Sequence, residues 1–164
     1  MTVTASPTRL RDAAAAFLAE PRIAVAGVSR DPKQPANLIF RRLRDAGHDV
    51  FAVNPNATTV EDGVRAYGHV GDIAEAVDGV VIVTPPDAAM AVVEDTARAG
   101  VPRVWFHRGI GPGSAPEAAI ARARELGLDV IPGGCPCMFG ETADTGHKVM
   151  CRVLQLTGKV PRRV

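Results

Sequence analysis

Polar, glycine-containing and proline-containing segments follow four apolar runs of the sequence, and these segments are the ones best suited to bind a ligand. They are Gly27-Val28-Ser29-Arg30, Asn54-Pro55, Thr84-Pro85-Pro86 and His107-Arg108-Gly109. In an open α/β sheet, ligands bind outside the carboxyl ends of the strands. A helix N-terminus after the first segment, together with Arg30 and Lys33, suits a phosphate group. The pattern therefore predicts a site for a phosphate-bearing nucleotide cofactor.

The first segment departs from the pattern that binds dinucleotides. That pattern reads G-x-G-x-x-G and has an acidic residue about 20 residues later. Here only the first glycine, Gly27, is present, and Ser29 and Pro32 replace the other two. Asn54 stands where the acidic residue is expected. An NAD(P)-dependent oxidoreductase is therefore kept as an alternative and is not the preferred interpretation.

Three cysteines and a histidine indicate a second kind of chemistry. Cys135 and Cys137 flank a proline, and His147 and Cys151 are four residues apart, so they share one face of a helix. Four such ligands could form a tetrahedral zinc site, although the C-x-C spacing is tighter than usual. We favour buried apolar thiols, with a zinc or thiol-redox protein as a further alternative. Nothing in the sequence flanks His147 that would activate it as a nucleophile, so we expect it on a helix surface.

An alternation of apolar strands and amphipathic helices predicts the scaffold that positions these residues. The expected strands are 23–26, 49–53, 80–83, 104–106 and 128–131. Whether residues 64–67 form a further short strand is left open. The expected helices are 8–20, a helix that ends at Gly47, 72–77, 86–99, a helix that ends at Gly127, and 142–156. This order predicts a Rossmann-like α/β fold, a doubly wound, mostly parallel five-stranded sheet with helices on both faces.

Several local features follow from this assignment. Asp72 is expected to cap the short helix 72–77, and Ser114 with Glu117 to form a capping box. Trp105 and Phe106 are expected to be buried in a strand, and residues 159–164 to be a frayed basic end. The whole chain, 1–164, is then a single domain with a core of about 15–155.

Composition narrows the classes of partner. The 164 residues carry a formal net charge of +1 and only 4% aromatic residues, which argues against nucleic-acid binding. No apolar run approaches the ~20 residues of a membrane span. Without an export signal, the three cysteines are expected to be reduced thiols in a cytoplasmic protein.

The combination and order of these motifs resembles the family of CoA-binding domain proteins. The resemblance rests on residues 23–33, Val53-Asn54-Pro55, Thr84-Pro85-Pro86, 104–109 and Cys135-Pro136, and covers roughly residues 15 to 155. Members are small stand-alone Rossmann-like proteins that are similar to the N-terminal domain of the succinyl-CoA synthetase α subunit. The resemblance implies that the chain binds coenzyme A or an acyl-CoA. The sequence shows no set of nucleophile, base and orienting residue and no paired carboxylates at the strand ends, so we expect no catalytic residues and no metal ligands.

The resemblance also implies roles for the segments that follow the strands. Gly27, Val28, Ser29 and Arg30 would line the pyrophosphate and the pantetheine entrance, and Lys33 would pair with a CoA phosphate. Asn54 and Pro55 would shape the adenosine side, and Thr84, Pro85 and Pro86 would bracket the ligand. His107 and Gly109 would lie near the pantetheine end. A mixed disulfide between Cys135 and the CoA thiol is an additional hypothesis. A homo-oligomer and an unidentified protein partner are left open.

Overall fold

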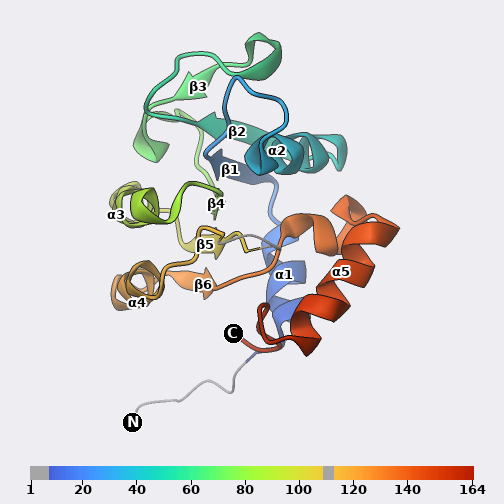
Figure 1. The fold of residues 1–164 in the computed structure, drawn as a ribbon. Helices are drawn as coiled ribbons and strands as arrows, with labels where there is room; N and C mark the ends of the chain where they lie inside the picture. Colours follow the sequence, from blue (N-terminus) through green and yellow to red (C-terminus); the bar gives the residue numbers. More distant parts are fainter. Residues whose placement is uncertain (1–7, 109–112) are drawn as a thin grey trace.

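The structure is a computed structural model that describes residues 8–108 and 113–164, and it confirms the predicted α/β class. Its sheet has six parallel strands in the order β3-β2-β1-β4-β5-β6 (Figure 1). The strands are β1 (Arg22–Ala26), β2 (Asp49–Val53), β3 (Ala66–Tyr67), β4 (Gly79–Ile82), β5 (Arg103–Phe106) and β6 (Asp129–Ile131).

Helices cover both faces of the sheet. Figure 1 shows α1, α2 and α5 on one side of the strands and α3 and α4 on the other. Their bounds are α1 (Leu10–Leu18), α2 (Pro35–Asp45), α3 (Ala89–Arg98), α4 (Glu117–Glu125) and α5 (Thr145–Leu156). Within residues 8–108 and 113–164, no helix has both the length and the apolar character that crossing a membrane requires.

The central strands are apolar because they are buried on both faces, as parallel strands are. In β1, Ile23 and Val25 pack in the core beneath α1, α2 and α5, whereas Ala24 packs in the core beneath α3 and α4. Trp105 and Phe106 of β5 are fully buried, which confirms the prediction. The chain leaves β1 towards one face and β4 towards the other, so these neighbouring strands form the topological switch point.

Two predictions about the β2–β4 connection are corrected by the structure. The sheet has six strands, not five, because Ala66 and Tyr67 pair in parallel with Ala52 and Val53 of β2. The predicted helix 72–77 is absent from this described segment, where a single 3₁₀ turn occupies residues 70–72. The carboxylate of Asp72 accepts the backbone N–H of His69 at 2.9 Å and so closes that turn.

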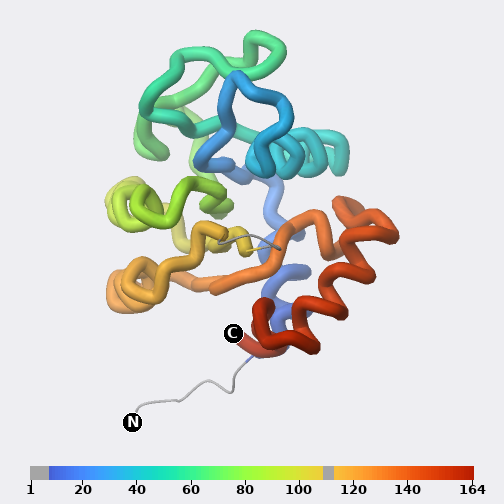
Figure 2. The backbone as a smooth tube through the Cα atoms, in the orientation of Figure 1, coloured from blue at the N-terminus to red at the C-terminus, as the bar shows by residue number. Residues whose placement is uncertain are grey.

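The basic C-terminus is attached to the body of the protein, so the prediction of a frayed end is wrong. The backbone N–H of Val164 donates to the carbonyl of Thr8 at 2.9 Å, and that of Leu10 donates to the carbonyl of Arg162 at 3.0 Å. Val160 is only 1% exposed. Figure 2 shows the C-terminus beside the start of α1. These bonds fix the start of α1 and the end of the chain to each other.

Candidate ligand-binding site

Gly27 allows the ends of three strands to meet at the switch point. It has a φ of +107°, and its N–H donates to the carbonyl of Val53 at 3.0 Å. A Cβ at this position would lie 2.6 Å from the carbonyl oxygen of Val83, too close for any other residue. Val28, the next residue, is buried in the core below the loop. The glycine therefore serves close packing of β1 against β4.

A buried polar network fixes the loop after β1, and sequence reasoning did not find it. Asn37 of α2 accepts the backbone N–H of Ser29 at 3.0 Å and donates to the carbonyl of the same residue at 2.8 Å. It also donates to Glu61 at 2.8 Å, and Glu61 binds the guanidinium of Arg41 at 2.6 and 2.8 Å. Asn37 is fully buried, which explains why its amide is saturated with partners. The one available signal was a polar residue within the apolar face of a helix.

The turn that leads into α2 is occupied by a carboxylate. The hydroxyl of Ser29 accepts the backbone N–H of Asp31 at 3.1 Å. Asp31 in turn accepts the backbone N–H of Lys33 and the side-chain amide of Gln34, both at 3.0 Å. The first of these bonds lowers the pKa of Asp31, and the second adds to the effect. The backbone N–H of Lys33 is therefore used inside the loop, whereas the Lys33 side chain is exposed.

A cavity of about 480 Å3 brings together three of the predicted residues. It is lined by Arg30, Ala66, Gly68 and residues 54–59, which include Asn54 and Pro55. Arg30 is the one charged side chain among these described lining residues. Asn54 holds the rim in place, since its amide donates to the carbonyl of Val28 at 2.9 Å and accepts the backbone N–H of Asn56 at 2.8 Å. Lys33 is not part of this lining.

The segment after β4 contains an unpaired buried hydroxyl. Thr84 Oγ1 is inaccessible to solvent and has no hydrogen-bond partner within the described residues. The neighbouring Pro85 and Pro86 are exposed. A buried donor without a partner is costly, and a bound molecule can satisfy it. This orphaned atom lies at the edge where a ligand is predicted.

Ser114 belongs to this edge and does not cap α4, so the predicted capping box is wrong. Its hydroxyl donates to the carbonyl of Thr84, and its backbone N–H donates to the carbonyl of His107 at 2.7 Å. Pro116 is the N-cap residue of α4, and Glu117 is therefore the first residue of the helix. The Ser114 hydroxyl bonds to the carbonyl of Thr84, and sequence spacing cannot reveal this contact.

His107 is held at the end of β5 and stays uncharged at neutral pH. Its backbone N–H donates to the carbonyl of Ile82 at 2.9 Å. Burial lowers the pKa of His107 to about 4, and repulsion from His147 adds to the effect. Gly109, the last of the predicted binding residues, lies outside the described residues. The described part of this edge therefore contains a neutral imidazole after β5 and an orphaned hydroxyl after β4.

The rival metal site is not formed within residues 8–108 and 113–164. No group of three or more histidine, cysteine or acidic residues in that part of the chain could hold a metal ion. The free thiols Cys135, Cys137 and Cys151 are buried in the core. The spacing of His147 and Cys151 does place them on one helix, α5.

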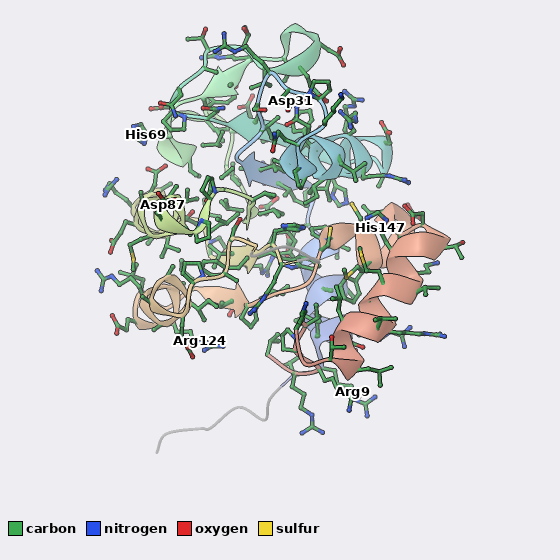
Figure 3. The ribbon with its side chains drawn as sticks, viewed as in Figure 1. Arg9, Asp31, His69, Asp87, Arg124 and His147 are labelled. Carbon is green, nitrogen blue, oxygen red and sulfur yellow. The ribbon has the colours of Figure 1, made fainter. Side chains whose placement is uncertain are left out.

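His147 has a partner that the sequence did not reveal. Its Nδ1 atom lies 2.7 Å from a carboxylate oxygen of Asp144, which also caps α5 by accepting the backbone N–H of His147 at 2.8 Å. These two bonds lower the pKa of Asp144, with the backbone N–H contributing most. Figure 3 shows His147 at the start of α5 and Asp31 in the loop before α2. The expectation that no neighbour in the sequence would activate His147 did not include Asp144, three residues earlier, and the His147 side chain is partly exposed, at 22%.

The fold defines a Rossmann-like α/β domain whose topological switch point lies between β1 and β4. The sequence matches the family described as "CoA binding domain" over residues 21–141, most of the chain. The chain therefore belongs to the CoA binding domain family, as the motifs predicted.

Proteins similar to this chain include stand-alone domains and a larger enzyme subunit. The uncharacterized protein YneT of Bacillus subtilis (strain 168) is 28% identical over 116 residues, which cover 70% of this chain and 81% of YneT. The acetate–CoA ligase [ADP-forming] II subunit alpha of Pyrococcus furiosus is 34% identical over 143 residues. That match covers 87% of this chain but 25% of the ligase subunit. A hypothetical protein from Pyrococcus horikoshii OT3 superposes with a TM-score of 0.72 at 26% identity, covering 90% of this chain and 97% of that one.

Proposed function

We propose that this chain binds coenzyme A or an acyl-CoA at the carboxyl edge of the sheet and performs no catalysis of its own. The observation that carries the proposal is the extent of the family match. Residues 21–141 contain all four segments that follow strands and every binding residue that the sequence predicted. Coenzyme A joins a phosphorylated adenosine to an uncharged, amide-containing pantetheine arm, so its site needs a cation at one end and neutral polar groups along the other.

The β1–β2 side of the edge supports the phosphorylated adenosine end. The cavity beside Arg30 is open and carries that one charge among its described lining residues, so it suits an anionic group next to an uncharged base. Asn54 and Pro55 form its rim. Lys33 lies three residues beyond Arg30 and is exposed, so it adds positive charge near the phosphates.

The β4–β5 side supports the pantetheine arm. The unpaired hydroxyl of Thr84 offers a hydrogen bond to an amide or thioester carbonyl. His107 is neutral, so it does not select for a charged group. Neutral polar groups at the ends of these two strands fit an arm that carries amides and no charge.

A dinucleotide is less well supported by the same residues. Ser29 occupies the place of the second glycine, and its backbone N–H and carbonyl are both bound by Asn37. Asn54, which stands where the ribose-binding acid is expected, has its amide engaged by Val28 and Asn56. Neither residue presents the groups that recognise the pyrophosphate and ribose of NAD.

Two features of the Pyrococcus furiosus relative bear on the proposal. It is named as a ligase, but this chain spans about a quarter of its length, so we carry over the ligand and not the reaction. Its name also describes a subunit, which supports a protein partner for this chain.

A thermal-shift panel tests the proposal. The protein is melted with CoA, acetyl-CoA, NAD, NADP, FAD and ATP in turn. A ligand at a hundred times its Kd stabilises the folded state by about 2.7 kcal/mol, a shift that is easily read. We expect CoA or acetyl-CoA to raise the Tm and NAD to leave it unchanged. Stabilisation by NAD but not by CoA would overturn the proposal.

A further inference from the structure

A cavity of about 950 Å3 lies between α1 and α5, and the proposed function does not use it. Its size is within the range of small-molecule sites. Two of its lining segments, residues 19–21 and 46–48, immediately precede β1 and β2, whereas the ligand edge follows the strands. Among the described residues, none of those predicted to bind CoA lines it. The cavity is therefore separate from the proposed CoA site.

The helices α1 and α5 run in opposite directions on either side of the cavity. At one end, the backbone N–H of Leu10, the first residue of α1, donates at 3.0 Å to the carbonyl of Arg162, which follows α5. At the other end, Leu18, the last residue of α1, lies beside Gly140, which precedes α5. Figure 1 shows the two helices side by side. The start of α1 therefore faces the end of α5.

One face of each helix lines the cavity, and these two faces carry three cations. Their spacing of three and four residues is that of a single helix face, and the lining residues are Arg11, Ala15 and Leu18 on α1 and Lys148, Cys151, Arg152 and Gln155 on α5. Because the helices are antiparallel, Arg11 near the start of α1 and Arg152 near the end of α5 lie towards the same end. Burial raises the pKa of Cys151, and the nearby charge of Arg11 opposes this rise. Two guanidinium groups from different helices therefore serve one end of the cavity.

The positive charge of these three lining cations is not neutralised by the carboxylates of the protein. None of the three takes part in an ion pair within the part of the chain that the structure describes. The other segments, residues 1–7 and 109–112, contain no aspartate or glutamate. Of the two lining carboxylates, Glu20 is bound to Arg103, which leaves Glu141. The cavity is therefore net basic and attracts anions.

The cavity also has an apolar part. Leu18, Met138 and Phe139 belong to its lining. The hydroxyl of Thr142 donates to the carbonyl of Phe139 at 2.6 Å and so fixes the segment that carries two of these side chains. With a rise of 1.5 Å per residue, Leu18 lies about 10 Å along α1 from Arg11. The cavity therefore combines cations at one end with apolar side chains about two helical turns away.

We propose that this cavity binds an organic anion with one carboxylate or phosphate head and an apolar body. Arg11 and Arg152 bind the head, since guanidinium groups pair with either oxyanion through parallel N–H···O bonds. The apolar body lies against Leu18, Met138 and Phe139 and is removed from water there. Inorganic phosphate lacks the body and a neutral alcohol lacks the head, so each forgoes part of the interaction.

The test is a titration of the full chain with octanoate, octyl phosphate, inorganic phosphate and octanol. Trp105 is the sole tryptophan, and its ring centroid lies 5.7 Å from that of Phe139, so its fluorescence reports on the cavity. We expect octanoate or octyl phosphate to bind saturably and at least about tenfold more tightly than inorganic phosphate or octanol. The tighter of the two amphiphiles identifies the head as a carboxylate or a phosphate. No saturable binding of either, or equal binding of octanol or inorganic phosphate, would overturn the proposal.

Two sets of variants locate the bound anion. Arg11→Gln and Arg152→Gln are each expected to weaken binding about tenfold, whereas Arg124→Gln, an exposed arginine on α4, controls for net charge. Ala15→Leu narrows the cavity without changing its charge and is expected to weaken binding by a similar factor. Ala16→Leu is its matched control, since Ala16 is the next residue of α1, is also exposed and lies outside the lining. Equal affinities within either set would overturn the proposed location.

A repeat of the titration at saturating CoA separates this cavity from the ligand edge. We expect the affinity for octanoate or octyl phosphate to be unchanged, because the two sites share no described residue. Displacement of the amphiphile by CoA would assign it to the ligand edge and overturn the proposal. The variant comparison does not require CoA to bind, so failure of the proposed function and failure of this inference remain distinguishable.

Discussion

The two halves of the carboxyl edge are held by different polar networks. After β1 and β2, the loop is fixed by Asn37, Glu61 and Arg41, whose polar groups bind one another and the backbone. After β6, the chain is fixed by Arg42 and Asp144, which lie beside free thiols.

The difference between the halves indicates a division of labour. In the first half, the buried charges are neutralised by each other, and Arg30 is left at an open cavity, which suits reversible binding. In the second half, Arg42 and Asp144 neutralise each other, and Cys135 and Cys137 are buried. Substitutions at Gly27, Asn37, His107 and Arg30 test this contrast.

Gly27→Ala is expected to disrupt the close packing of β1 against β4, which positions the loop after β1. The new Cβ would meet the carbonyl of Val83 at 2.6 Å, and the φ of +107° is strained for alanine. We expect a loss of at least about 3 kcal/mol in the free energy of unfolding, measured by urea denaturation. Gly47→Ala is the matched control, since its φ is +94° but nothing lies within 4 Å of the new Cβ. It should cost only about 1 kcal/mol, and equal losses at the two sites would show that close packing is not the cause.

Asn37→Ala removes the central residue of the binding half. The backbone groups of Ser29 and one oxygen of Glu61 lose a buried partner. We expect a loss of about 2 to 3 kcal/mol in urea unfolding together with weaker CoA binding. Asp45→Ala, at an exposed position on α2 and outside the lining of the cavity, is the control and should leave both quantities nearly unchanged. A stable Asn37→Ala protein with full affinity would contradict the account of this network.

His107, at the end of β5, is expected to make the free energy of unfolding depend on pH. Its pKa is lowered to about 4 in the folded state, so below the ordinary value of 6.5 the unfolded chain binds a proton that the folded chain does not. Stability is therefore complete above pH 6.5 and is lost as the pH falls towards 4. Between pH 7 and pH 5 the wild type should lose about 2 kcal/mol more than His107→Gln in urea unfolding. Equal losses in the two proteins would show that His107 is not the group responsible.

Arg30→Ala is expected to weaken CoA binding without affecting the fold. The side chain is exposed and lines the cavity, so its loss removes a charge-assisted contact worth about 1.4 kcal/mol, or tenfold in Kd. Isothermal titration measures the affinity, and the Tm of the free protein should not change. Arg44→Ala, an exposed arginine on α2, is the control for net charge. An equal effect of both substitutions would point to general electrostatics and not to a contact at Arg30.

The strands and the segments that follow them were predictable because they depend on local pattern. The runs 23–26 and 80–83 are continuously apolar, since both faces of a central parallel strand are buried. The family match confirms the resemblance that the motifs carried. The roles of individual binding residues remain predictions that the CoA experiments test.

The features that sequence analysis missed depend on residues far apart in the chain. Asn37 is a polar residue on the apolar face of α2, and its partner Glu61 is 24 residues away in the sequence. Ser114 matches a helix cap, but the Thr84 carbonyl 30 residues earlier binds its hydroxyl. Tertiary contacts of this kind override local propensity.

The most direct test of the central claim is a crystal structure of the protein with CoA bound. The account predicts the phosphorylated adenosine in the cavity beside Arg30 and residues 54–59, with the pantetheine arm passing Thr84 towards His107. CoA bound instead in the cavity between α1 and α5, or a strand edge left empty at saturating CoA, would contradict it.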